Sequence, residues 1–246
     1  MKPVIYHTGL TPPPEIQYND FEVLHTPTIT VEFNYHHIPQ DIIECLKSNP
    51  VAVIMSKNAV SGLKKWLKKY NLSSDVFENT PFWTVGEQTY QNLLDELGIE
   101  SWHPELMTGE GIIQSLIEKG QTRILLISAH EPQQNFIDGL SNAGIHFFHF
   151  PTYTTQILSD AKLTAEFVDD ENNFMVCTSP STVDGILKSL SLTHLADLKT
   201  KLTSIGPTTS SAICERGGSV YHESGEQKIS TLYSEIITMD FNHEQL

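Results

Sequence analysis

Four short patterns occur twice in this chain of 246 residues, in the same order and at nearly one spacing. The copies are offset by 120, 123 or 124 residues. The pairs are Val4-Ile5-Tyr6 with Ile124-Leu125-Leu126, Pro27-Thr28-Ile29-Thr30 with Pro151-Thr152-Tyr153-Thr154, Val53-Ile54-Met55-Ser56 with Val176-Cys177-Thr178-Ser179, and Thr84-Val85-Gly86 with Ser204-Ile205-Gly206. Such matches indicate an internal repeat. We therefore expect two copies of one structural unit, each of roughly 100–120 residues and each large enough for its own core.

Both copies alternate short apolar runs with amphipathic segments, which is the pattern of parallel α/β layers. Strands are expected at 3–7, 22–25, 51–55, 82–85, 123–128, 145–150, 174–178 and 202–205. Helices are expected at 40–48, 58–70, 87–97, 110–119, 132–143, 181–190, 208–216 and 231–238. We predict two similar parallel-sheet α/β domains, joined by a two-stranded β linker, with a substrate cleft between them.

Glycines mark the helix ends expected in the two copies. Gly98 and Gly218 fall where a left-handed helix terminus favours glycine. Each follows a glycine at the start of its helix, Gly86 or Gly206, by the same distance. The sequence therefore predicts two helices of equal length.

Charge and composition exclude several classes of partner. The formal net charge is −15, with Arg123 and Arg216 as the only arginines, and such a field repels nucleic acid and anionic membranes. With no apolar run of ~20 residues and no signal peptide at Met1-Lys2-Pro3, we expect a cytoplasmic protein, and a monomer. The three cysteines and the eleven histidines show no ligand spacing, so neither a disulfide framework nor a metal site is predicted.

Hydroxyl residues follow two of the repeated strands. Ser56 and Ser179 each end an apolar strand and precede a helix, where ligands of parallel sheets collect and where free N–H groups bind anions. The alternative is that each serine only caps its helix. Gly86 and Gly206 form a second pair, accompanied by the hydroxyls of Thr89, Thr208 and Thr209. For these the alternative is a tight turn with a cap.

The motifs together resemble those of the uroporphyrinogen-III synthase family, over essentially the whole chain. The matching segments are Cys177-Thr178-Ser179-Pro180-Ser181, Ser204-Ile205-Gly206-Pro207-Thr208-Thr209 before Gly217-Gly218, the stretch from Gly144 to Tyr153, Thr84-Val85-Gly86 with Thr89, and Gly109-Glu110-Gly111-Ile112-Ile113. The resemblance implies a cytosolic, cofactor-free lyase of tetrapyrrole and haem biosynthesis. Its reaction cyclises hydroxymethylbilane, a small linear tetrapyrrole octacarboxylate, to uroporphyrinogen III with inversion of ring D and loss of water.

The resemblance also implies interleaved domains, with residues 1–32 and 158–246 in one, 38–150 in the other, and linkers at about 33–37 and 151–157. Tyr153 is then the candidate donor of a proton or hydrogen bond to the leaving hydroxyl, the alternative being that it packs across the domain junction. The residues implied in substrate binding are Ser56, Lys57, Gly86, Thr89, Ser179, Ser181, Gly206, Thr208 and Thr209.

Two loops depart from the family pattern, which usually carries an arginine in each. His7-Thr8 follows the first strand, and His130 lies in the loop after the strand at 123–128. If either histidine replaces an arginine, substrate binding should weaken as the pH rises above ~6.5. Two further readings remain open: a non-catalytic two-lobed binding module for a tetrapyrrole or other polyanion, and a periplasmic-type solute-binding protein, which should carry an export signal.

Overall fold

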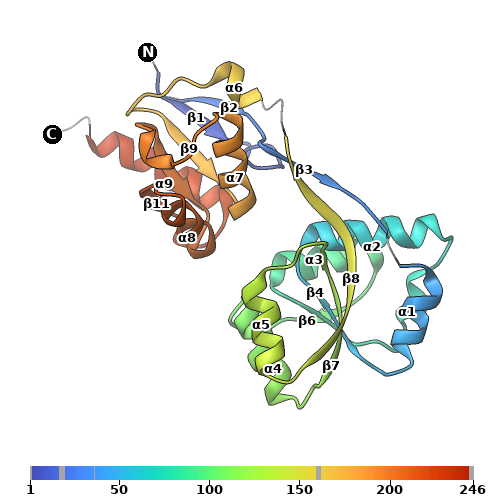
Figure 1. The fold of residues 1–246 in the computed structure, drawn as a ribbon. Helices are drawn as coiled ribbons and strands as arrows, with labels where there is room; N and C mark the ends of the chain where they lie inside the picture. The colour runs from blue at the N-terminus through green and yellow to red at the C-terminus, as the bar shows by residue number, and fades with distance from the viewer. Residues whose placement is uncertain (1, 17–19, 36, 159–161, 244–246) are drawn as a thin grey trace. The chain divides into compact units, whose positions relative to one another are not determined.

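The computed structural model describes residues 2–16, 20–35, 37–158 and 162–243, without the side chains of 240–243 (Figure 1). The chain forms two compact units. Unit 1 consists of Met1–Thr30 and Thr155–Leu246, and unit 2 of Val31–Thr154. The linker expected at 33–37 includes residue 36, which lies outside the described residues.

Unit 1 is built on a five-stranded parallel sheet in the order β11-β10-β9-β1-β2. The strands are β1 (Val4–His7), β2 (Glu22–His25), β9 (Phe174–Cys177), β10 (Lys201–Ser204) and β11 (Val220–Glu223). The helices are α6 (Lys162–Glu166), α7 (Pro180–Ser189), α8 (Pro207–Glu215) and α9 (Ile229–His243), with a short 3-10 helix η2 (Leu195–Asp197).

Alternate residues of the unit 1 strands feed two separate cores, because successive side chains of a strand point to opposite faces. Tyr6 and Met175 pack with α7 and α8 through residues such as Val183. Ile5 and Phe174 pack on the other face with Leu232, Tyr233 and Ile236 of α9. Helices therefore cover both faces of the sheet (Figure 1).

Unit 2 is built on a six-stranded sheet in the order β3-β8-β7-β4-β5-β6. The strands are β3 (Ile29–Glu32), β4 (Val51–Ile54), β5 (Phe82–Thr84), β6 (Ser101–Trp102), β7 (Arg123–Ala129) and β8 (His146–Ile157). The helices are α1 (Pro39–Leu46), α2 (Lys57–Lys69), α3 (Glu87–Leu97), α4 (Gly109–Glu118) and α5 (Gln134–Asn142), with the 3-10 helix η1 (Ser74–Phe77). Ala52 and Ile54 pack with α2 and α3, whereas Val51 and Val53 pack with α4 and α5.

The two sheets share one strand order, which the repeated patterns predict. Beginning from β2, the order in unit 1 is β2-β1-β9-β10-β11, and beginning from β8 the order in unit 2 is β8-β7-β4-β5-β6. The predicted α/β class with two parallel sheets is confirmed. No helix of the described residues has the length and apolar character needed to cross a membrane.

Several elements differ from the sequence-based expectation. The strand expected at 145–150 and the linker expected at 151–157 are one continuous strand, β8, which neighbours β3 in the sheet. The short edge strands β6 and β11 lie where no strand was expected, because neither contains an apolar run. β6 has only two residues, and in β11 Val220 is followed by Tyr221, His222 and Glu223.

The prediction for the second helix terminus is wrong. Gly217, not Gly218, is left-handed, with φ +77°. Helix α8 therefore ends earlier than its counterpart and has 9 residues, whereas α3 has 11 and ends at left-handed Gly98. Gly218 is required for another reason, since a Cβ atom there would lie 2.9 Å from side chains of Ile213 and Leu195.

Candidate functional site

The carboxyl edge of the unit 2 sheet brings Ser56 and Tyr153 together. Ser56 follows β4 and caps α2, where its Oγ accepts a hydrogen bond from the Ala59 N–H at 3.2 Å. Tyr153 comes from β8, and its Oη lies 3.0 Å from the same Ser56 Oγ. The serine is thus a helix cap, and it also contacts the tyrosine hydroxyl. Ser56 was identified from its place after a strand and Tyr153 from the family resemblance, and neither argument indicated this contact.

Tyr153 is a protonated phenol at neutral pH. Its side chain is 9 % exposed, and burial raises the pKa of its hydroxyl, while the hydrogen bond with Ser56 acts in the opposite direction. The backbone of Tyr153 is also fixed, because its carbonyl oxygen accepts the His130 N–H at 2.7 Å. A buried, oriented hydroxyl that keeps its proton suits a hydrogen-bond or proton donor.

The helix start next to this pair favours anions. The first turn of α2, residues 57–60, is fully described and contains no acidic side chain. Its first residue, Lys57, is exposed. The free N–H groups of a helix start and the helix dipole attract carboxylates. The neighbouring helix α3 is different: Gly86 precedes it and Thr89 is nearly buried, but Glu87 occupies its first turn and contacts His103 Nε2 at 2.9 Å.

Unit 1 repeats the serine cap with one addition. Ser179 Oγ accepts the Thr182 N–H at 3.3 Å, and Thr182 Oγ1 accepts the Ser179 N–H at 3.2 Å. In unit 2 the residue equivalent to Thr182 is Ala59, which has no hydroxyl to accept the Ser56 N–H. Ser181 lies half-buried in the first turn of α7. At the start of α7 the Ser179 N–H thus has a side-chain acceptor within the same helix turn, whereas at the start of α2 the Ser56 N–H has no equivalent acceptor in Ala59.

The second helix start of unit 1 follows β10. Gly206 precedes α8, and Pro207 is its first residue. Thr208 is exposed, whereas the Thr209 side chain is only 3 % exposed. No acidic residue occurs in this turn of the described chain. The structure thus places each of the nine residues implied in substrate binding at a helix start on the carboxyl side of a parallel sheet, two helix starts in each unit.

Sequence reasoning missed a pair of contacts that fix these helices. Thr152 Oγ1 donates to the Ala59 carbonyl oxygen at 3.3 Å, and a Cβ atom on Gly62 would lie 2.7 Å from Thr152. The same arrangement recurs in unit 1, where Thr28 Oγ1 donates to the Thr182 carbonyl oxygen at 3.2 Å and Gly185 faces Thr28. The signal was present in the repeats, because each serine is followed by a glycine six residues later.

The expectation that His7 acts as a cation is wrong. Its side chain is 1 % exposed, and burial, with a smaller contribution from His25, lowers its pKa to about 4. His7 is therefore neutral at physiological pH and cannot replace an arginine by charge. His130 is exposed after β7, and its role as a replacement stays a prediction.

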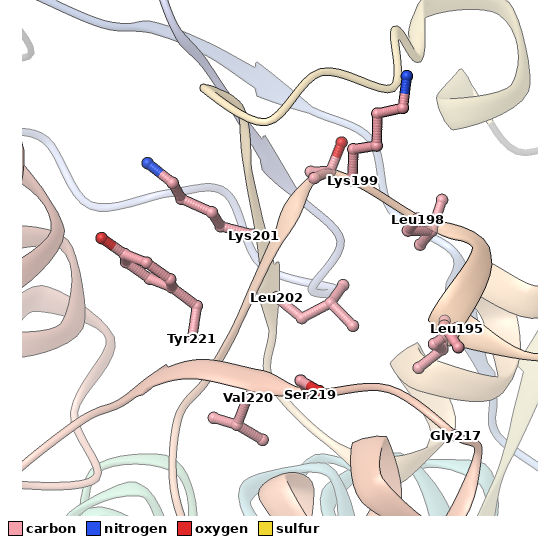
Figure 2. A pocket seen from close by; sticks show the side chains of 11 residues that line it. Leu195, Leu198, Lys199, Lys201, Leu202, Gly217, Ser219, Val220 and Tyr221 are labelled. Carbon is pink, nitrogen blue, oxygen red and sulfur yellow. The ribbon is translucent and has the colours of Figure 1, made fainter.

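A wide cavity of about 490 Å³ lies at the opposite edge of the unit 1 sheet, at the amino ends of β10 and β11. Lys201, Tyr221, Leu195 and Leu202 are among the residues that line it (Figure 2). Ligands of open parallel sheets bind at the carboxyl ends of strands, so we place the site at the helix starts and not in this cavity. Among the described residues no group of three or more His, Cys, Asp or Glu side chains is arranged to hold a metal ion.

The fold is that of a protein with two α/β units, each of which has helix starts at the carboxyl ends of a parallel sheet. A family model described as uroporphyrinogen-III synthase HemD matches residues 14–234. The chain belongs to the uroporphyrinogen-III synthase family, lyases of porphyrin and tetrapyrrole biosynthesis. Among curated proteins, none matches the chain.

Solved structures agree with this assignment at the level of the fold. A mutant uroporphyrinogen III synthase from the extremely thermophilic bacterium Thermus thermophilus is 13% identical with a TM-score of 0.64, and the match covers 96% of this chain and 99% of that chain. Uroporphyrinogen-III synthetase from Helicobacter pylori is 19% identical with a TM-score of 0.63, covering 97% of this chain and 100% of that chain.

Proposed function

We propose that Tyr153, supported by Ser56, is the acid of the uroporphyrinogen-III synthase reaction in this chain. The reaction is the cyclisation of hydroxymethylbilane to uroporphyrinogen III, with inversion of ring D and loss of water. The observation that carries the assignment of Tyr153 is its 3.0 Å contact with the cap of α2. The repeat adds support, because the equivalent residue in unit 1 is Ile29, which shows that the fold does not need a hydroxyl at this position.

The first step breaks the bond between the terminal hydroxyl and its carbon. Tyr153 gives its proton to the departing oxygen, which leaves as water, and the attached pyrrole supplies the electron pair that forms an azafulvene cation. Ser56 assists this transfer. Its Oγ accepts the Ala59 N–H, so its own hydrogen is available to donate to Tyr153 Oη, and that bond stabilises the phenolate as the proton leaves.

The next steps require geometry more than acid strength. The substituted carbon of ring D attacks the cation to give a spiro intermediate, which fragments and recloses with the ring turned over; the proton then lost from the ring returns to the tyrosinate. Closure without the protein gives the unturned isomer. The site must therefore hold the substrate in the reactive orientation, and orientation alone can supply several kcal/mol.

The carboxylates of the substrate are the groups to be oriented. We assign them to the starts of α2, α7 and α8, where Ser56, Lys57, Ser179, Ser181, Thr208 and Thr209 accompany main-chain N–H groups. Gly86 and Thr89 take part more weakly, because Glu87 repels a carboxylate from the start of α3. We further propose a cytoplasmic monomer without a cofactor, and the net charge of −15 supports the absence of nucleic-acid partners.

Lys57 provides a test of the carboxylate assignment. Lys57→Gln is expected to raise KM about 3-fold and to leave kcat unchanged, because an exposed charge contributes under 1 kcal/mol. The increase should shrink in high salt, which screens exposed charges. Lys68→Gln, the same charge change in the last turn of the same helix, is the control and should have the KM of the unaltered protein. Equal KM values for both variants would remove Lys57 from the site.

The decisive experiment measures which isomer is formed. Purified protein is incubated with freshly generated hydroxymethylbilane, the products are oxidised, and uroporphyrins I and III are separated by chromatography. We expect predominantly uroporphyrin III. Uroporphyrin I alone, formed at the spontaneous rate, would favour the alternative of a non-catalytic binding module for a tetrapyrrole or other polyanion.

A further inference from the structure

A buried hydrogen-bond network fixes the loop that follows β1, and the chemistry proposed above does not use it. His7, the last residue of β1, has Nδ1 2.9 Å from Tyr233 Oη and Nε2 2.9 Å from the Thr11 carbonyl oxygen. The Tyr233 side chain, on α9, is fully buried. A second histidine, His25 at the end of β2, places its Nε2 2.9 Å from the Gly9 carbonyl oxygen. Two histidines therefore hold two carbonyl groups of one loop.

The partners fix the protons of His7. A carbonyl oxygen only accepts, so Nε2 of His7 carries the hydrogen and donates it to Thr11. Nδ1 is then the acceptor, and Tyr233 is the donor. The titratable groups that face His7 are His25 and Tyr233, with ring centroids 5.5 and 5.8 Å away. Because the pKa of His7 is lowered to about 4, this arrangement persists at neutral pH.

The repeat shows that the fold alone does not require a histidine here. The position equivalent to His7 in unit 2 is Leu126, because His7 pairs with Val176 whereas Leu126 pairs with Val53, the counterpart of Val176 in the repeat. Leu126 is also fully buried. Burying an imidazole costs free energy unless both ring nitrogens find partners. An aliphatic residue would satisfy the core, so the histidine serves the loop.

The network determines which polar atoms of the loop remain available. A trans peptide group is planar, with its C=O and N–H pointing in opposite directions, and the described chain has no cis peptide bond. Because the Gly9 carbonyl points to His25, the Leu10 N–H points away from it. The Thr11 carbonyl is also occupied, and Pro12 has no N–H. The carbonyl oxygens of Gly9 and Thr11 are therefore both occupied by histidine side chains, and the Leu10 N–H is a donor on the opposite side of the loop.

The loop lies beside one of the helix starts assigned above. A Cβ atom on Gly9 would lie 2.9 Å from the Thr178 side chain, and Thr178 immediately precedes Ser179, the cap of α7. The neighbours of β1 are β2 on one side and β9 on the other, so the direction of strand order reverses between β1 and β9. Such a reversal is where open parallel sheets bind ligands.

We propose that His7 is a positioning residue for the carboxylate site at the start of α7. Through Tyr233 and Thr11, it holds the loop so that carbonyl oxygens face the protein interior and an amide N–H faces outward. A carboxylate at Ser179 then meets a donor and no exposed carbonyl. This role rests on the proposed function, and it requires hydrogen bonding by His7 rather than charge.

Two substitutions of His7 separate hydrogen bonding from packing. His7→Ile introduces an aliphatic side chain, the kind that unit 2 carries at this position, and removes both bonds. We expect KM for hydroxymethylbilane to rise about 10-fold with kcat within about 2-fold, the size of one good hydrogen bond. His7→Gln offers one donor and one acceptor and should recover most of the loss. The control is His194→Gln, at an exposed histidine next to η2, which should leave KM unchanged. A KM within 2-fold of the unaltered value in a folded His7→Ile protein would overturn the proposal.

Tyr233→Phe decides the matter if His7→Ile does not fold. It removes only the donor to Nδ1, and KM should rise while the circular dichroism spectrum is retained; an unchanged KM would contradict the role of the network. The imidazole ¹⁵N spectrum of the unaltered protein is independent of activity and should show neutral His7 protonated at Nε2. If the protein is active but its His7 is charged or protonated at Nδ1, the hydrogen-bond network is wrong and the proposed function stands. If His7 is neutral and protonated at Nε2 but the protein makes only uroporphyrin I, the proposed function is overturned, and the role of His7 with it.

Discussion

Tyr153→Phe is expected to lower kcat for uroporphyrinogen III formation about 100-fold, the lower end of the contribution of a general acid. KM should change little, because the carboxylates are bound elsewhere. The aromatic ring remains to fill the core of unit 2, so the circular dichroism spectrum and the unfolding midpoint should stay close to those of the unaltered protein. The measurement is single-turnover formation of uroporphyrin III, separated from isomer I.

Tyr35 supplies the matched control for Tyr153. It is also a tyrosine of unit 2 whose pKa is raised by burial, but its hydroxyl has no partner among the described residues. Tyr35→Phe should therefore keep kcat within about 2-fold and gain up to about 1 kcal/mol in free energy of unfolding, because an unsatisfied buried hydroxyl is removed. Equal kcat values for Tyr153→Phe and Tyr35→Phe would exclude Tyr153 as the acid.

Ser56→Ala tests the relay to Tyr153 separately. It removes the hydrogen bond that supports the phenolate but leaves the tyrosine, so the loss in kcat should be smaller than for Tyr153→Phe, about 10-fold. It also removes a cap, at a cost of about 1 kcal/mol. The matched control is Ser179→Ala, which loses the equivalent cap in unit 1 and contacts no tyrosine hydroxyl in the described chain. Its kcat should be unaffected.

The fold was largely predictable because it rests on patterns that are local and repeated. Buried strands such as Val51–Ile54 are short apolar runs, and the serines after β4 and β9 mark helix starts by their side-chain chemistry. The elements that were missed lack such a pattern. β11 is an edge strand in which half-buried and exposed residues alternate, so it has no apolar run, and the end of α8 depends on which of two adjacent glycines is left-handed.

The site was predictable only residue by residue. Ser56 and Tyr153 could both be chosen from the sequence, but the hydrogen bond between them depends on how β8 passes α2, which no spacing encodes. His7 was misread for a related reason. The expectation that His7 has its usual pKa assumes an exposed side chain. The strand instead places His7 against Tyr233 of α9, where burial lowers its pKa. The identity of a residue thus indicated which chemistry was available, and only packing showed its protonation state.

The second large effect is expected from adding one methyl group to α2. In Gly62→Ala the new Cβ atom would lie 2.7 Å from the Thr152 carbonyl oxygen and side chain. The backbone oxygen cannot rotate away, so α2 must shift, and such overpacking costs about 1–3 kcal/mol. Alanine is favoured over glycine in a helix by about 1 kcal/mol, so any net destabilisation shows that the contact with Thr152 dominates. We expect a net loss of about 1 kcal/mol, the middle of the overpacking range less the gain in helix propensity.

The location of the tryptophans allows each unit to be followed. Trp66, Trp83 and Trp102, the only three in the chain, all belong to unit 2. Urea unfolding followed by tryptophan fluorescence should therefore shift in Gly62→Ala. In Gly185→Ala, where the new Cβ would lie 2.5 Å from Thr28 Oγ1, the shift should appear in circular dichroism and not in fluorescence. Lys68→Ala, at an exposed position of the same helix, is the control and should not be destabilised.

The same pair of variants connects this packing to catalysis. A shift of α2 carries Ser56 away from Tyr153, since Thr152 and Tyr153 are adjacent in β8 while Ser56 caps α2. Gly62→Ala should therefore reduce kcat at a urea concentration of zero, where the protein is still folded. Gly185→Ala moves α7, whose cap contacts no such hydroxyl, and should raise KM without lowering kcat. If both variants are destabilised but keep the unaltered kcat and KM, the glycine and threonine contacts serve stability only, and the alignment of Ser56 with Tyr153 does not depend on them.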